Sequence, residues 1–515
     1  AALATLGVGA LAGAKFAHAV YPLLAPLPDA KASEAFRPTE GADRLVRDVA
    51  TAAAMAMTYV WRAPETDDEW RAAHEAAAAL LLKLCQVNRG VYVKLGQHVA
   101  QLQHLLPQPY IEAMSSMKSD APRSASELVE GVLREELGDG WRELLLDFET
   151  EPVASASLAQ VHRARSRGGE PLAVKVQHAG LRETSAADIT AVSLLIAAAA
   201  RLFPRQFDYT WLAEELARNL PQELDFCREG RNAERTAALF ADDPRVVVPR
   251  VHWALSTARV LVMDYEEGCH VDDAAAIRRM GLRTGDVARL VSEVFARQAF
   301  DSGFVHCDPH GSNMLIRPRA TGGAGSGGGR GAAGTPQLVL LDHGLYRELP
   351  GAFRRHYAAL WRAIIFGDAR GIERHARALG VPQYHLLAGM LTTHSWDVIV
   401  DSSLDRLAVT TDTEAKAKLA TNVAAYADSI MTLLRTCPRE LLLLFKANDC
   451  LRTIDLALGA PINTHVVMAR QAARSRYADA MAGVSVDGDD GGDGGGGGDG
   501  SGDGAAPGVG ARLSA

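Results

Sequence analysis

The chain has 515 residues, of which 48% are hydrophobic, so it can bury a large core and form more than one packed unit. Its formal net charge is −8, but six Asp against one Arg within residues 483–515 contribute −5 of that, which leaves −3 elsewhere. No basic, aromatic-rich patch appears, and we expect no nucleic-acid partner. The six Cys are scattered without a C-x-x-C pair, which predicts reduced thiols rather than disulfides or a zinc site.

The two ends differ in composition from the middle of the chain. Residues 1–45 begin with an apolar, Ala-rich run that is short for a membrane span and lacks the Arg and Ser enrichment of a transit peptide. We interpret this stretch as a leader or anchor region. A signal remnant, a membrane-touching helix and a disordered leader are all compatible with it. Residues 483–515 are rich in Gly and Asp, which predicts a disordered tail.

Three units are predicted between the ends. Residues 46–147 are Ala-rich, with apolar positions three and four apart, and predict a helical extension. Residues 148–268 show short apolar strands around a helical insert, and residues 269–482 are mainly helical with two strands. A Gly-rich stretch from Thr321 to Pro336 separates those two strands. We interpret it as a surface insert whose removal leaves enough residues for a hairpin.

Two stretches in the third unit carry the strongest functional signal. Gly303-Phe-Val-His-Cys-Asp-Pro-His-Gly-Ser-Asn313 places Asp308 five residues before Asn313, and Leu338-Val-Leu-Leu-Asp-His-Gly344 ends an apolar strand with Asp342. Phosphoryl transfer from a nucleotide needs a carboxylate facing the acceptor and oxygen ligands for magnesium. The kinase motifs H-R-D-x-x-x-x-N and D-F-G supply these groups in this order. Asp308 therefore takes the base position, and Asn313 and Asp342 take the Mg²⁺ positions.

The second unit supplies candidates for nucleotide binding. Pro171-Leu-Ala-Val-Lys-Val-Gln177 is an apolar strand interrupted by Lys175, and a Lys there requires a carboxylate partner. Spacing alone does not choose that partner among the carboxylates of an acidic helix. Before this strand, small residues occupy the place of a glycine-rich phosphate loop. The hinge that would face adenine begins at Met263 and includes Tyr265. The loop candidates are Ala154, Ser155, Ala156 and Ser157, and the helix carboxylates are Glu223, Asp225 and Glu229.

Four linked motifs resemble the UbiB/AarF-domain (ADCK) atypical kinase family, and within it the AarF-domain-containing kinase one subgroup. They are the Ala-rich loop, the Lys175 strand, Gln222-Glu-Leu-Asp-Phe-Cys-Arg-Glu229 and Val93-Lys-Leu-Gly-Gln97. The resemblance makes Lys175 the phosphate-binding Lys and Glu229 its partner. It assigns Lys94, Gly96 and Gln97 to the K-x-G-Q motif, and it assigns Glu223 and Asp225 to the E-x-D motif whose carboxylates meet that Lys.

The resemblance implies an α+β, protein-kinase-like two-lobed fold with a family-specific helical N-terminal extension. It also implies binding of ATP or ADP with Mg²⁺, and slow ATPase or small-molecule or lipid kinase activity in organellar lipid or quinone homeostasis. The implied partners are a lipid or isoprenoid acceptor, a membrane surface and a protein partner, and the implied location is mitochondrial or, alternatively, plastid membrane. A nucleotide-gated pseudokinase scaffold is the alternative, and protein phosphorylation in trans is disfavoured.

One departure from the family pattern concerns turnover. The catalytic turn of the family continues H-P-G-N, whereas this chain reads His310-Gly-Ser-Asn313. Proline would fix φ near −65°, so its loss predicts a less constrained Asn313. We therefore expect the missing proline to affect turnover more than nucleotide binding.

Overall fold

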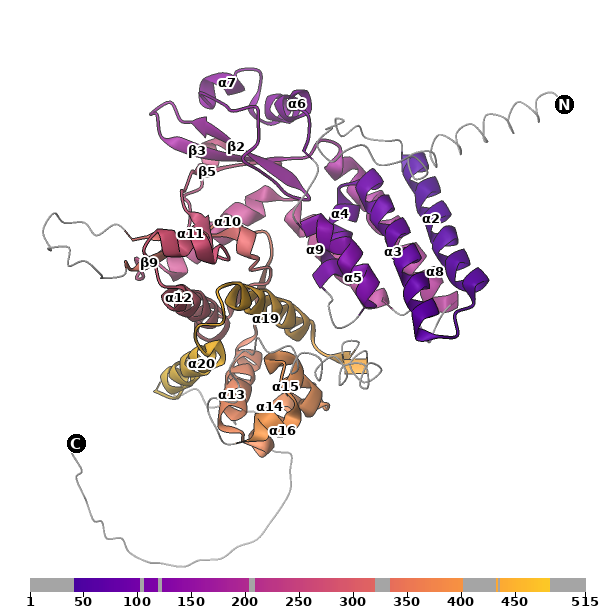
Figure 1. Cartoon of the computed structure of the whole chain (residues 1–515). Coiled ribbons are helices and arrows are strands. Elements are labelled where there is room, and N and C mark those ends of the chain that lie inside the picture. Colours follow the sequence, from indigo (N-terminus) through magenta and orange to yellow (C-terminus); the bar gives the residue numbers. More distant parts are fainter. Residues whose placement is uncertain are drawn as a thin grey trace, which may run out of the picture.

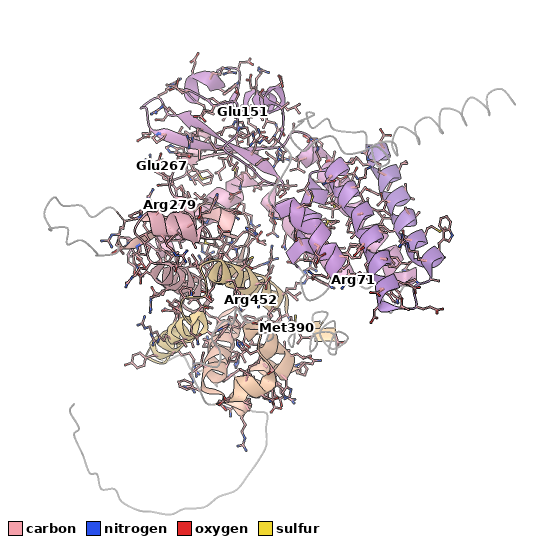
Figure 2. All side chains as sticks on the ribbon, viewed as in Figure 1. Arg71, Glu151, Glu267, Arg279, Met390 and Arg452 are labelled. Atoms are coloured by element: carbon pink, nitrogen blue, oxygen red, sulfur yellow. The ribbon has the colours of Figure 1, made fainter. Side chains whose placement is uncertain are left out.

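The computed structural model describes residues 41–101, 106–118, 123–202, 209–319, 334–401, 432–433 and 436–481. Several predicted features lie outside these residues. They are most of the leader, Leu102 and Leu105 of the predicted helical extension, most of the Gly-rich insert and the tail. Figure 1 shows three parts: a helical bundle beside a small sheet, and a larger helical part below both. In Figure 2 Arg71 lies on the bundle, Glu151 on the sheet part, and Met390 and Arg452 in the lower part.

The small sheet forms the core of the N-lobe. Its strand order is β1 (Ala154–Ser155), β2 (Ala159–Arg165), β3 (Pro171–Gln177) and β5 (Val260–Asp264), with all pairs antiparallel. Strands β3 and β5 are almost continuous apolar runs, because both faces of this sheet are covered. Two helices, α6 (Ser126–Leu137) and α7 (Trp141–Leu144), pack their apolar residues on one face of this sheet.

The helical bundle stands beside the N-lobe. It contains α2 (Gly41–Arg62), α3 (Asp67–Asn88), α4 (Val91–Gln101), α5 (Gln108–Ser115), the 3₁₀ turn η1 (Ser116–Lys118), α8 (Leu181–Leu202) and α9 (Thr210–Glu223). Its core joins Leu84 and Val93 with Leu216 and Leu220. The spatial grouping thus differs from the division predicted at residues 147 and 148. The packing assigns α6 and α7 to the N-lobe and α8 and α9 to the bundle, because apolar spacing indicates a buried helix face but not its partner.

The C-lobe is built on one large helical core with strands at its upper edge (Figure 1). A second sheet has the order β4 (Val246–Val247), β9 (Pro336–Leu340), β8 (Met314–Pro318) and β6 (Cys269–His270). A two-stranded sheet pairs β7 (Phe304–His306) with β10 (Tyr346–Glu348). The helices and turns of the C-lobe are α11 (Ala274–Arg279), α12 (Thr284–Ala296), the π-helix η3 (Arg297–Ser302), η4 (Gly311–Asn313), α13 (Gly351–Phe366), α14 (Ala369–Ala378), α15 (Tyr384–Thr392), α16 (Trp396–Val400), α19 (Arg439–Ala457) and α20 (Thr464–Met481). Helix α10 (Phe226–Leu239) and the turn η2 (Trp253–Leu255) contact β5, and α10 packs on the second face of the N-lobe sheet.

The hairpin predicted around the Gly-rich insert is present as β8 and β9. Pro318 pairs with Pro336 in this hairpin, and the Arg319 amide donates to the Thr335 carbonyl at 2.9 Å. The insert was predicted to extend to Pro336, and this boundary is wrong because Pro336 is already the first residue of β9 and pairs with Pro318.

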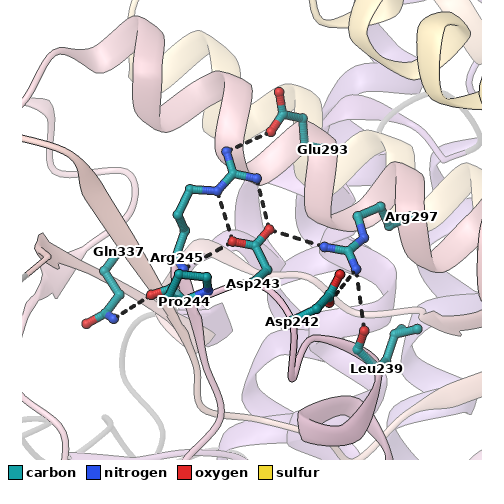
Figure 3. Close-up of polar contacts among 8 residues, drawn as sticks. All are labelled: Leu239, Asp242, Asp243, Pro244, Arg245, Glu293, Arg297 and Gln337. Atoms are coloured by element: carbon teal, nitrogen blue, oxygen red, sulfur yellow. Dashed lines mark hydrogen bonds and ion pairs between the residues drawn. The ribbon is translucent and has the colours of Figure 1, made fainter.

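A network of charges joins the connection after α10 to helix α12 (Figure 3). Asp243 accepts from Arg245 Nε and Nη2, both at 2.9 Å, and from Arg297 Nη1 at 3.1 Å, while Arg245 Nη1 donates to Glu293 at 3.0 Å. The hydrogen bonds from Arg245 lower the pKa of Asp243. The Arg245 carbonyl also accepts from the Leu338 amide at 2.8 Å. The network therefore fixes β4 against β9, the strand that leads to Asp342.

Candidate functional site

Lys175 lies at the centre of the site, in the middle of β3. Its neighbours across the sheet are Val161 of β2 and Leu261 of β5. Its Nζ lies 2.6 Å from Glu229 Oε1 and 3.3 Å from Asp342 Oδ2. Burial alone would lower the pKa of Lys175, but Asp342 and Glu229 outweigh it and raise that pKa, so the ammonium stays charged. Of the three helix carboxylates, Glu229 is the one that pairs with Lys175.

Asp342 follows the last residue of β9. Its Oδ1 accepts from the Gly344 amide at 3.0 Å, and its Oδ2 faces Lys175. Burial would raise the pKa of Asp342, but Lys175 and other nearby groups outweigh it and lower that pKa. This half-buried carboxylate is therefore ionised, which is the form that binds a metal ion.

Asp308 and Asn313 lie in the turn between β7 and β8. The Asp308 amide donates to His306 Nδ1 at 3.1 Å, and the Asn313 amide donates to the His310 carbonyl at 2.9 Å. The Leu341 amide donates to the Asn313 carbonyl at 2.9 Å. These hydrogen bonds hold Asn313 beside the residue that precedes Asp342, although the turn lacks the proline of the family.

Gly311 explains the altered order of residues in this turn. A Cβ atom at position 311 would lie 2.5 Å from Asp272 Oδ2 and 2.8 Å from its Cγ. Asp272 lies just after β6, which pairs with β8. With Asp272 in this position only glycine fits, so a proline here would require the Asp272 side chain to move.

A second group of charges surrounds Asp308. Lys94 of α4 places Nζ 2.6 Å from Glu223 Oε2 and 3.9 Å from Asp308 Oδ2. Burial would lower the pKa of Lys94, but Glu223 and Asp308 outweigh it and raise that pKa. Lys446 of α19 places Nζ 3.3 Å from Asp308 Oδ1. Asp308 therefore lies between one lysine from the helical bundle and one from the C-lobe.

The remaining motif residues support the helices that carry Lys94 and Glu229. Gln97 Nε2 donates to the Met117 carbonyl at 3.1 Å, and a Cβ at Gly96 would lie 3.1 Å from Met117 Cγ. Asp225 caps α10 by accepting from the Cys227 amide at 3.1 Å. The expectation that both E-x-D carboxylates meet Lys94 thus holds for Glu223, whereas Asp225 makes its described contacts at the start of α10.

The Ala-rich loop lies above β3 and is held by a histidine. Ala154 and Ser155 form β1, the Ala156 amide donates to the Ala159 carbonyl at 2.7 Å, and Ser157 is buried. His178 places Nε2 3.0 Å from the Ala156 carbonyl and Nδ1 2.7 Å from Ser124 Oγ. A carbonyl only accepts, so Nε2 carries the proton and Ser124 donates to Nδ1. Burial lowers the pKa of His178 to about 4, which keeps the ring neutral.

The predicted hinge residues lie at the end of β5. Met263 is buried and pairs with Ala173 of β3. The Tyr265 amide donates to the Pro171 carbonyl at 3.0 Å, and its hydroxyl accepts from Arg163. Because the Tyr265 amide already has a partner within the sheet, adenine would have to be recognised by other backbone groups of this segment.

The carboxylates fit a magnesium–nucleotide complex better than a metal ion alone. Within the described residues, no group of three or more His, Cys, Asp or Glu side chains is arranged to hold a metal. Asn313 and Asp342 would leave most of the coordination sphere to phosphate oxygens and water, as Mg²⁺ prefers. Glu223 Oε1 is buried without a hydrogen-bond partner among the described atoms. Because such an orphaned oxygen is costly, a hydrogen-bond donor brought to this oxygen would stabilise the site.

Comparison with known proteins identifies the class and then the family. Residues 116–376 match the ABC1 atypical kinase-like domain. The chain is 39% identical over 444 residues to a putative ABC1 protein of Arabidopsis thaliana, covering 83% of this chain and 82% of that protein. It is 38% identical over 428 residues to AarF domain-containing protein kinase 1 of Mus musculus, covering 81% and 78%. A solved structure, the Rv3197–erythromycin complex of Mycobacterium tuberculosis, overlays with a TM-score of 0.43 at 24% identity, covering 76% and 97%.

The fold is thus that of an atypical kinase. The chain belongs to the ABC1/AarF family, and the kinase-like fold with a helical N-terminal region is confirmed. Among the helices that the structure describes, none has both the length and the apolar run required to cross a bilayer.

Lys446, His306 and His343 are parts of the site that the motifs did not identify. His306 and His343 are buried, and Tyr346 stacks on both rings and fixes the segments that carry Asp308 and Asp342. A signal for Lys446 was present in the sequence. It follows five apolar residues in Leu441-Leu-Leu-Leu-Phe-Lys446, and a charge in such a run requires a partner.

Proposed function

We propose that this protein binds Mg–ATP or Mg–ADP between its lobes. We further propose that it slowly hydrolyses ATP or transfers its γ-phosphoryl group to a small or lipid-derived acceptor. The observation that carries the proposal is the position of Lys175 Nζ, 2.6 Å from Glu229 and 3.3 Å from Asp342. This Lys–Glu pair beside a strand-end Asp is the arrangement that kinases use to hold nucleotide phosphates and metal.

Each predicted residue has a role in the proposed chemistry. Lys175 binds the phosphates, and Asn313 and Asp342 hold Mg²⁺, which would neutralise charge on the phosphate oxygens. Asp308 accepts the proton of the acceptor hydroxyl or of water. The acceptor oxygen then forms a bond to the γ-phosphorus, the bridging bond to the β-phosphate breaks, and ADP leaves with that electron pair. Lys94 faces Glu223 and Asp308 from the bundle side.

Family membership supports the proposed acceptor and location. We propose an isoprenoid-derived or other lipid acceptor, in quinone or membrane-lipid homeostasis, and association with a mitochondrial or plastid membrane. Lys94 and Glu223 form part of the wall around Asp308, which favours a small or flexible acceptor over a folded protein.

A nucleotide-gated scaffold is the second candidate, and the contacts of Asp308 favour it. Two lysines lie within 3.9 Å of its carboxylate oxygens, and they would compete with an acceptor proton. In such a scaffold nucleotide binding would move the lobes and a partner would read the change. Labelled ATP with and without liposomes separates the two candidates, because transfer or lipid-stimulated hydrolysis supports the enzyme and binding without either supports the scaffold.

Asp342→Asn tests nucleotide binding directly. Ligand at 100-fold excess over its dissociation constant stabilises a protein by about 2.7 kcal/mol. We expect a clear rise in melting temperature with Mg–ATP for the wild type and little or none for Asp342→Asn, since the amide cannot replace the carboxylate on Mg²⁺. Asp401→Asn, which changes a C-lobe Asp at the end of α16, serves as the control and should keep the rise. An equal rise in Asp342→Asn would refute the metal assignment.

A further inference from the structure

Lys446 is a lysine at a core position of α19. Leu443, Ala447 and Cys450 on the same face of the helix are buried, and Leu443 packs with Cys307 and Leu345. Cys307 directly precedes Asp308, and Leu345 lies three residues after Asp342. Residues three apart on a helix share a face, so this packing places Lys446 beside the catalytic turn. Only 14% of its side chain is exposed.

The distances separate two kinds of lysine contact in the site. Lys94 and Lys175 each lie 2.6 Å from a Glu oxygen, which is a direct charge-assisted hydrogen bond. Lys446 lies 3.3 Å from Asp308 Oδ1, longer than the roughly 2.7–2.9 Å of such a bond. Lys446 is thus a nearby counter-ion rather than a tightly bonded partner, and a ligand oxygen could replace Asp308 without breaking a short bond.

The transfer step requires a cation at this place. Negative charge on the transferred phosphoryl group is stabilised by positive groups aimed at its oxygens. The turn from Asp308 to Asn313 contains neither Lys nor Arg. In the proposed function Lys175, bonded to Glu229, binds phosphates from the N-lobe side, and Lys94 is bonded to Glu223. The cation that faces Asp308 from the C-lobe side is Lys446.

We propose that Lys446 contacts the γ-phosphoryl group of bound ATP, and that Asp308 holds its ammonium in place until the nucleotide arrives. The inference rests on the proposed function, because it needs nucleotide between the lobes. It adds a phosphate-binding residue from α19, about 270 residues after Lys175 in the sequence.

The test compares Mg–ATP with Mg–ADP, since only ATP carries the γ-phosphoryl group. Dissociation constants of both are measured by calorimetry on the full chain for wild type, Lys446→Met and Lys446→Arg. We expect Lys446→Met to weaken Mg–ATP by about tenfold or more, as for the loss of a hydrogen bond to a charged group, and to leave Mg–ADP within about twofold. Lys446→Arg should restore the preference for ATP. Arg452→Met, on the same helix and paired with Asp449, is the control (Figure 2), and both affinities should be unchanged.

Equal weakening of both nucleotides, or of neither, would overturn the inference and make Lys446 a structural residue. If Lys446→Met does not fold, Asp308→Asn is compared with Asp308→Asn/Lys446→Met, because the pair of changes leaves no unpaired charge. Loss of ATP preference only in the double variant supports the inference, and its retention refutes it. A wild type that binds neither nucleotide refutes the proposed function itself.

Discussion

Two groups of lysines and carboxylates form the site, and they differ in how they join the parts of the molecule. The β3 cluster (Lys175, Glu229 and Asp342) lies within the two kinase-like lobes. The α4 cluster (Lys94, Glu223, Asp308 and Lys446) joins the helical bundle to the C-lobe. In both clusters a Glu oxygen lies 2.6 Å from a lysine Nζ, whereas an Asp oxygen lies 3.3–3.9 Å from a lysine Nζ. The glutamates position the lysines, and the aspartates are available to a ligand. Lys94 therefore has two roles: it joins the bundle to the C-lobe, and it forms part of the proposed transfer site.

Lys94→Met should have the largest effect and breaks the α4 cluster. Removal of one partner from a buried ion pair costs about 3–5 kcal/mol because the other charge stays buried. We expect a loss of that size in the free energy of unfolding, measured with denaturant. Lys94→Met/Glu223→Gln should recover most of it, since the buried charge is then gone. An unchanged stability in the single variant would mean that the bundle does not depend on Lys94.

His178 allows a pH test of the Ala-rich loop, because its Nε2 lies 3.0 Å from the Ala156 carbonyl. Its folded-state pKa of about 4 lies below the ordinary histidine pKa of 6.5, so its contribution to stability is complete above pH 6.5 and is lost as pH falls toward 4. His178→Gln keeps an amide donor for the Ala156 carbonyl but does not titrate. We expect wild type to lose more unfolding free energy than His178→Gln between pH 6.5 and 4, by on the order of 1 kcal/mol. Parallel curves would contradict the role of His178.

Ala154→Gly should change the β3 cluster's nucleotide chemistry with a small cost in stability. Alanine restricts the backbone conformations that glycine permits, so the present loop offers the phosphates a narrower geometry. We expect altered ADP and ATP affinities or ATPase rate, with a stability cost of about 0.5–1 kcal/mol. Wild type and Ala154→Gly are each measured at the same number of degrees below their own melting temperature. Unchanged affinities and rate would show that the loop does not set the chemistry.

Replacement of residues 321–333 by a short Gly-Ser turn should have the smallest effect. The strands on either side already pair at Pro318 and Pro336, and loop length costs little entropy. Mg–ATP should still raise the melting temperature by the wild-type amount. Loss of that rise would place the insert in the site.

The sequence predicted those parts of the site that follow directly from a buried strand. Lys175, Asp308 and Asp342 each interrupt or end an apolar run, and an apolar run that contains a charge indicates both the strand and the need for a partner. The choice of Glu229 over Glu223 could not be made from spacing, because α9 ends at Glu223 and α10 begins after Asp225. The two carboxylates therefore lie on different helices, a break that the acidic pattern does not reveal.

The sequence pattern does not show which surface each helix packs against or which residue pairs with Lys446, because both depend on tertiary packing. The apolar spacing of α6 and α8 predicts that each helix has a buried face, but α6 packs on the N-lobe sheet and α8 on the bundle. Lys446 could have been found by the argument used for Lys175, applied to a helix rather than a strand. Its partner Asp308 lies 138 residues earlier in the sequence, and only the fold brings the two together.

The contact between Lys175 and Asp342 has a consequence for the order in which the site assembles. A lysine ammonium 3.3 Å from Asp342 Oδ2 occupies the side of the carboxylate that a metal ion would approach, and it repels a bare cation. Under the proposed function, nucleotide phosphates would give Lys175 a new anionic partner and would carry Mg²⁺ with them. Magnesium should therefore enter together with the nucleotide rather than before it, and its occupancy should follow the concentration of the Mg–nucleotide complex instead of that of the free ion.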